Sequence, residues 1–192
     1  MKTIAQHITE RLQLNKYRVQ QYEYFPKTKQ ELKDIIYKIT NEHKNDKVID
    51  LNMIDTSKIT DMAELFRNNN YNYNIDKWNV SNVENMNAMF MNSKFNNDIS
   101  QWDVSNVKDM SFMFENSKFN QDISQWDVLR VENMYAMFED SKFNGDISQW
   151  DVSSVENVKF MFAMSKFNQD LTPWKSKIKD KRQLIHIQYY IK

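Results

Sequence analysis

The sequence has no cysteine, a single glycine, two prolines and three histidines among its 192 residues. Without cysteine the chain has no disulfides, thiolate nucleophiles, cysteine zinc sites or lipidated cysteines. A single glycine argues against backbone loops that hold phosphates. The histidines are scattered, and no metalloprotease or nucleophile motif is present. We therefore expect a protein that is not an enzyme, with no catalytic residue, no cofactor and no metal.

Long apolar runs are also missing. No run of about 18 apolar residues is present, so the sequence predicts no membrane span. The first twenty residues lack a continuous apolar region, because His7, Glu10 and Arg11 interrupt it. We expect a cytoplasmic protein on this basis. An extracellular form whose signal peptide had been removed would look the same.

Charges are balanced over the whole chain but unevenly placed. The net charge is +3 over residues 1–54, −8 over 55–174 and +5 over 175–192. An acidic middle argues against a groove for nucleic acid along that part. The basic ends leave one alternative open, a nucleic-acid-binding or phage-borne regulatory or inhibitory protein that uses its termini.

What the chain does have is a repeat. The stretch FNNDISQWDVSNV, which begins at Phe95, returns with few changes from Phe119 and from Phe143. The five tryptophans follow one another at a spacing of 24 residues: Trp78, Trp102, Trp126, Trp150 and Trp174. A fixed period of this size is typical of a solenoid, in which each unit buries its apolar side against its neighbours. We expect an N-terminal cap over 1–54, five repeats over 55–174 and a C-terminal cap over 175–192.

Apolar spacing inside the repeat predicts its local structure. A stripe at i, i+3, i+6 and i+7, starting at Val107, predicts a short helix over 107–115. Residues 122–126 are rich in β-branched and aromatic side chains, which predicts a short strand. Parallel strands on the inner face and helices on the outer face would curve the stack. The tryptophans should be buried, and replacing the edge residue Trp174 should cost less than replacing Trp126.

Polar residues also recur at fixed places. An asparagine column is expected to satisfy backbone groups where the coil turns: Asn72, Asn96, Asn120, Asn144 and Asn168. Two aspartate columns are expected to cap turns: Asp98, Asp122, Asp146, Asp170, and Asp103, Asp127, Asp151. Calcium binding by these aspartates is the alternative, and we disfavour it because calcium-binding repeats need glycine-rich turns.

The N-terminal segment is expected to form a helical cap. Its apolar stripes predict one helix over about 3–13 and a second over about 29–43. Thr28 and Glu31 have the spacing of a capping box, in which each side chain bonds the other residue's amide. An extended stretch over 17–25 lies between the helices, and a partial first strand is expected to lead into the repeats.

The motif FNxDISxWDVSNVxxMxxMF resembles the BspA-like leucine-rich-repeat family, in the form first described in mycoplasma surface proteins. The likeness covers residues 55–174, and 24–32 is similar to the lead-in of small bacterial and phage-borne members. The resemblance implies an α/β solenoid, a right-handed leucine-rich-repeat-like coil stack. It also implies protein binding, often at cell surfaces, and brings no catalytic residues. A surface adhesin that lacks its signal peptide is therefore a further alternative.

Our main expectation is a monomeric protein–protein interaction scaffold with a protein partner and no nucleic acid. Columns that are the same in every coil serve the fold, so a specific patch belongs at positions that vary. From two such columns we select four candidates: Tyr135, Lys159, Glu115 and Glu139. Tyr135 is the best of them, because tyrosine offers a large contact area at low entropic cost.

Two other interpretations remain. Variation in these columns is also what drift at solvated positions would produce. The competing surface is the regular inner face, which would suit a repetitive or basic partner: Gln101, Gln125, Gln149, Asp103, Asp127 and Asp151.

Overall fold

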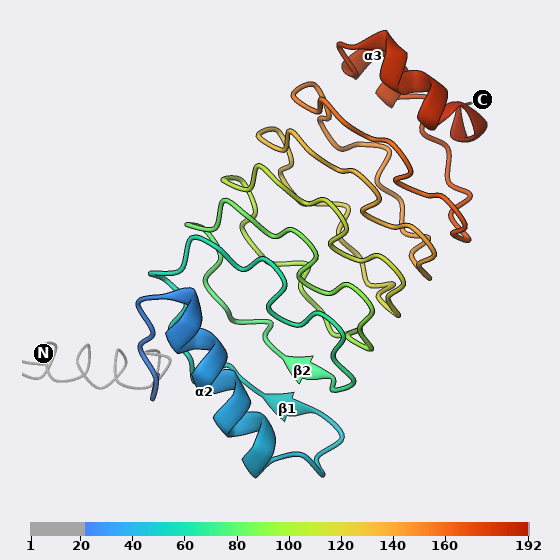
Figure 1. The fold of residues 1–192 in the computed structure, drawn as a ribbon. Coiled ribbons are helices and arrows are strands. Elements are labelled where there is room, and N and C mark those ends of the chain that lie inside the picture. The colour runs from blue at the N-terminus through green and yellow to red at the C-terminus, as the bar shows by residue number, and fades with distance from the viewer. Residues whose placement is uncertain (1–21, 192) are drawn as a thin grey trace, which may run out of the picture.

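The computed structural model describes residues 22–191. Most of this chain winds into coils that lie one above the next, with helical segments at both ends of the row (Figure 1). Regular elements are short and few. In chain order they are α2 (Lys29–Glu42), β1 (Ile49–Asp50), β2 (Tyr73–Asn74), α3 (Trp174–Lys177) and the 3-10 helices η1 (Lys181–His186) and η2 (Gln188–Tyr190). The helix predicted over 3–13 lies outside the described residues.

Helix α2 begins where the sequence predicts. The hydroxyl of Thr28 accepts a hydrogen bond from the Glu31 N–H at 3.2 Å, which satisfies one free amide of the first turn. The Glu31 carboxylate bonds the N–H of Lys27 at 2.6 Å, not that of Thr28. The predicted helix and its cap are therefore confirmed, and the return bond of the capping box lies one residue earlier. The stripe that α2 buries is apolar: Leu32, Ile36 and Ile39.

Short parallel pairings connect this segment to the first coil. Strand β1 pairs with β2 in parallel, with Ile49 opposite Tyr73. The predicted extended stretch over 17–25 is described only from residue 22, and there Tyr24 makes a single parallel bridge to Ile54. The chain thus enters the coil stack through a partial strand, as the sequence predicts.

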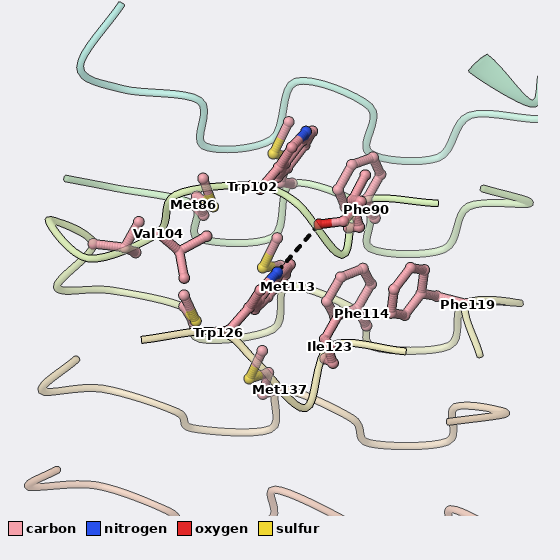
Figure 2. Packing of buried hydrophobic residues seen from close by; sticks show 14 of the residues in the cluster. Met86, Phe90, Trp102, Val104, Met113, Phe114, Phe119, Ile123, Trp126 and Met137 are labelled. Atoms are coloured by element: carbon pink, nitrogen blue, oxygen red, sulfur yellow. Dashed lines mark hydrogen bonds between the residues drawn. The ribbon is translucent and has the colours of Figure 1, made fainter. Parts of the chain in front are cut away.

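The tryptophan column is buried, as predicted, with each side chain at most 4% exposed. Each indole N–H donates to the backbone carbonyl 27 residues earlier, as Trp126 does to Ile99 at 3.2 Å (Figure 2). The rings of Trp126 and Trp150 stack with centroids 6.4 Å apart. The phenylalanines stack beside them, with Phe114 5.5 Å from its counterpart in the coil before.

The segment predicted as a short helix instead carries the backbone bonds between coils. Its N–H groups at alternate residues donate to carbonyls of the next coil at 2.8–2.9 Å: Met110 to Asn133, Phe112 to Tyr135, Phe114 to Met137 and Asn116 to Glu139. Phe112 and Asn116 have φ of 58° and 48°, which an α-helix does not contain. The helix predicted over 107–115 is therefore wrong. The prediction failed because successive turns place the same side chains inward as a helix would. Packed helices also need 8–10 Å between their axes. Equivalent rings in successive coils, such as Phe90 and Phe114, are only 5.5 Å apart.

The segment predicted as a strand is a pair of turns. Asp122 accepts the N–H of Ser124 at 2.9 Å, and the N–H of Trp126 donates to the Ile123 carbonyl at 3.2 Å. An aspartate that bonds its own chain two residues later favours a turn over a strand. The strand prediction at 122–126 is therefore wrong. The parallel bridges between coils lie in another column: Asp61, Asn85, Asp109, Asn133 and Asn157.

The asparagine column is a ladder that satisfies backbone groups, as predicted. The side-chain oxygen of Asn96 accepts the N–H of Asn120 at 2.8 Å, and Asn120 accepts that of Asn144 in the same way. The bond repeats from Asn72 to Asn96 and from Asn144 to Asn168. The ladder fixes the register of neighbouring coils on this side.

The last coil is covered by the C-terminal segment. Tyr190 packs edge-on against Phe162 and Phe167, with centroids 5.2 Å and 5.3 Å away. The carbonyl of Tyr190 accepts the N–H of Leu171 at 2.6 Å. Trp174 is completely buried beneath this cover. This burial does not support the expectation that replacing Trp174 costs less than replacing Trp126, and that expectation stays untested.

Candidate interaction surface

We call the side of the stack where N–H groups of each coil donate to carbonyls of the next coil the turn face. It comprises five equivalent segments, one in each coil: 62–68, 86–92, 110–116, 134–140 and 158–164. Its inward residues are the constant methionine and phenylalanine columns, which are buried. Its other residues differ between coils, so a specific patch can be formed there without disturbing the core.

Three aromatic rings from successive coils meet on the turn face. The Tyr135 ring lies 5.0 Å from Phe112 and 5.6 Å from Phe160, in an edge-on arrangement with the latter. Tyr135 and Phe112 are partly buried, whereas Phe160 is 53% exposed. We call these three residues the aromatic strip. Edge-on and tilted aromatic pairs at these distances are favourable beyond the area they bury.

Of the aromatic strip, only Tyr135 was predicted from the sequence. Phe112 and Phe160 belong to a column that also varies: Glu64, Ala88, Phe112, Ala136 and Phe160. All five have φ between 51° and 59°, so this backbone conformation belongs to the coil and not to the strip. The signal that could have found them is an aromatic residue in a variable column next to that of Tyr135.

Lys159 adjoins the strip in the last coil. It is exposed, directly before Phe160, and its side chain makes no ion pair among residues 22–191. Met164, in the same segment, is 82% exposed. The predicted residues Tyr135 and Lys159 therefore lie with Phe160 and Met164 at the C-terminal part of the turn face.

Glu115 and Glu139 lie in adjacent coils and are partly buried. One carboxylate oxygen of Glu115 is buried without a hydrogen-bond partner among the described residues. Burial raises the pKa of Glu115, and the negative charge of Glu139 raises it further. A cation or a hydrogen-bond donor brought by a partner would stabilise the ionised form of Glu115. Within 22–191 no group of three or more acidic, histidine or cysteine side chains could hold a metal ion.

The regular face has its polar groups largely satisfied by its own turns. All six predicted residues are exposed. The amides of Gln101, Gln125 and Gln149 donate to the serine just before each of them, at 3.1–3.3 Å. The carboxylates of the three aspartates accept backbone N–H groups two residues later, at 3.0–3.2 Å: Asp103, Asp127 and Asp151. Bonds from Ser153 also lower the pKa of Asp151.

A polar hollow of about 700 Å³ lies at the C-terminal end of the stack. Glu132 and Glu156 contribute negative charge to its lining, and Lys179 and Arg182 contribute positive charge. Gln183 also lines it. Arg182 is already paired with Asp180 at 2.9 Å, and this pair holds the pKa of Asp180 at about 2. No helix within the described part of the chain is long and apolar enough to cross a bilayer.

Stacked coils built from constant columns, with variation confined to a few outer positions, define a repeat protein. The chain belongs to the family described as mycoplasma protein of unknown function, DUF285, whose model matches residues 31–140 and 115–188. The two matches overlap, as expected where similar coils follow one another. No curated protein and no solved structure matches the chain.

Proposed function

We propose that this chain is a non-enzymatic protein–protein interaction scaffold, a leucine-rich-repeat-like solenoid of the BspA type. Membership in a repeat family supports the general class. The stack of coils supports it as well, since such stacks present long surfaces on which few positions determine binding. The partner is a protein, and the coils hold its binding site rigidly.

The aromatic strip is the observation that carries this proposal. Its rings lie outside the constant core columns, so the fold does not require them. Clustered aromatic side chains, partly buried on a rigid surface, are typical of the residues that dominate binding energy. Glu115, with its unpartnered carboxylate oxygen, adds a polar group that a partner's donor can satisfy.

The test is a pull-down from the native host with matched double variants. Phe112→Ala with Tyr135→Ala removes two rings of the strip, and we expect at least about 30-fold weaker binding of the partner. Gln125→Ala with Asp127→Asn is the control on the regular face, and it should bind normally. Thermal melts of both variants show whether the coils remain folded. Loss of binding in the second variant alone would place the site on the regular face and overturn the proposal.

A further inference from the structure

All backbone bonds between coils on the turn face point the same way. The N–H groups of the earlier coil donate, and the carbonyls of the later coil accept. At the interface between the fourth and fifth coils these bonds measure 2.8–2.9 Å: Met134 to Asn157, Ala136 to Lys159, Phe138 to Met161 and Asp140 to Ala163. The last coil consequently has donors with no further coil to accept them.

Only one of these four donors is satisfied by the C-terminal segment. The N–H of Val158 donates to the side-chain oxygen of Gln183 at 3.2 Å. The N–H groups of Phe160, Phe162 and Met164 have no hydrogen-bond partner among residues 22–191. Buried backbone donors are almost always paired, and Phe162 is only 3% exposed. Gln183 shows that an amide oxygen fits the first place in this row.

Side chains of the last coil differ from those of the earlier coils at the same row. At the position of Met164 the first three coils have asparagines, and their amides bond from coil to coil at 2.8–3.0 Å. The fourth has Asp140, and the fifth has a methionine that is 82% exposed. Phe160, four residues earlier, is 53% exposed. The unpaired donors are thus flanked by exposed apolar side chains, which a bound segment could bury.

The net charge around the last coil indicates what kind of segment would bind there. Residues 175–192 carry a net charge of +5, and Lys159 and Lys166 of the last coil are exposed. Within the described part of the opposite end, 22–54, six basic side chains are balanced by six acidic ones. A second copy that stacked this end on the row would therefore bring no net charge to attract its basic side chains. An acidic segment of another protein would be attracted.

We infer that the C-terminal end of the stack binds an acidic segment of a partner protein, which also carries apolar side chains. The segment lies along 158–164 as a further layer, and its carbonyls at alternate residues accept the N–H groups of Phe160, Phe162 and Met164. The inference rests on the proposed function and names the kind of partner. It places a second contact beside the aromatic strip, with which it shares Phe160.

The chain supplies a probe for this site. A synthetic peptide with the sequence of residues 131–140, VENMYAMFED, carries three acidic side chains and no basic ones. Inside the protein this segment already accepts the corresponding N–H groups of the third coil. The matched control is the same peptide made of D-amino acids, which keeps charge and hydropathy but has backbone geometry of the opposite hand.

The experiment measures amide hydrogen exchange by NMR on the full chain, with and without the peptide. At a peptide concentration ten times its Kd, the amides of Phe160, Phe162 and Met164 should exchange about tenfold more slowly. The equivalent amides of the fourth coil should not change: Ala136, Phe138 and Asp140. Absence of binding, binding without slower exchange at these three amides, or equal binding of the D-peptide would overturn the inference.

Two charge-reversal variants complete the test. Lys159→Glu should weaken peptide binding about tenfold at low salt, because attraction becomes repulsion beside the row. Lys118→Glu, an exposed lysine of the third coil, should bind the peptide normally. Concentration-dependent dimers that protect the same amides would show that a second copy is the occupant and overturn the inference. The aromatic-strip variants test the proposed function separately, since they leave residues 158–164 unchanged.

Discussion

The two ends of the coil stack are closed in different ways. At the N-terminal end α2 lies against the first coil, where the hydroxyls of Thr40 and Tyr73 are 3.2 Å apart and Lys29 pairs with Asp61 at 3.0 Å. At the C-terminal end three short helical elements cover the last coil, mainly through Gln183 and Tyr190. The C-terminal cover leaves Ile185 and Tyr189 61% and 88% exposed.

The ends also differ in the backbone groups left over. In the turn-face row of the first coil, four carbonyls have no hydrogen-bond partner among the described residues, and they belong to Asp61, Ala63, Leu65 and Arg67. The same row in the last coil has three N–H groups without a partner among the described residues. Unpaired carbonyls are tolerated better than unpaired N–H groups, and α2 already covers part of that edge. The direction of the inter-coil bonds on the turn face therefore leaves the unpaired N–H groups at the C-terminal end, where we infer that a partner binds.

The largest effect should come from the buried tryptophans. Trp174→Ala at the C-terminal end should reduce the free energy of unfolding by about 3–5 kcal/mol, as Trp126→Ala should in the middle. The reason is that Trp174 is completely buried and its indole bonds the Ile147 carbonyl at 3.0 Å. Denaturant melts measure both. A much smaller loss at Trp174 would mean that the C-terminal cover is open in solution.

Next in size is a pair of substitutions, one at each end. Leu32→Ala in α2 should cost about 2–5 kcal/mol, because this side chain is fully buried. Ile185→Ala in η1 should change stability by no more than about 0.5 kcal/mol, since most of its surface already faces water. Equal losses at the two sites in urea melts would contradict the difference between the ends.

Capping residues give a smaller contrast. Thr28→Ala should cost about 0.5–2 kcal/mol, because a free amide of the first turn of α2 loses its acceptor. Asp180 accepts the N–H of Arg182 at 3.0 Å and begins η1 in the same way. It is partly exposed and opens a short 3-10 helix, so Asp180→Ala should cost less than Thr28→Ala. Thermal melts of the two variants under identical conditions decide the order.

The smallest effect concerns one tyrosine at each end. Burial raises the pKa of Tyr73 and of Tyr190 above 10.0. Above the unfolded pKa of about 10, unfolding releases these protons, so stability should fall as pH rises through that value. Tyr190→Phe should make the fall shallower, and Tyr73→Phe should do so more strongly. Tyr73→Phe also removes bonds to Thr40 and Asn69, so its stability at neutral pH should be lower. Melts between pH 9 and about 11 test this, and an unchanged slope in both variants would contradict it.

Features set by the period could be predicted from the sequence. Every coil meets the same neighbours, so a column that repeats every 24 residues must occupy the same place in each of them. This is why the predictions of buried tryptophans and of an asparagine ladder were correct. Helix α2 was predictable for a local reason, since its stripe and its cap follow one another within 29–42.

The local structure of the coil could not be predicted in the same way. Inward side chains at i, i+3 and i+7 fit a helix and also a series of turns, so the spacing around Val107 did not distinguish them. What decides between them is the spacing of the coils, set by rings such as Phe90 and Phe114 stacked at 5.5 Å. The aromatic strip was found only in part, because Phe112 and Phe160 approach Tyr135 through the turn geometry. The unpaired row of N–H groups depends on bond direction, which no residue pattern reveals.

The uniform direction of the inter-coil bonds on the turn face has a consequence for the length of such proteins. On the turn face each coil donates to the next coil and accepts from the one before, so any two inner coils are interchangeable partners. An in-frame duplication or deletion of 24 residues between Asn79 and Trp150 would leave both caps on their usual neighbours. Chains of this kind can therefore grow or shrink by whole coils in a single genetic event. Each such event moves the C-terminal row by one layer relative to α2 and changes the distance between the two ends.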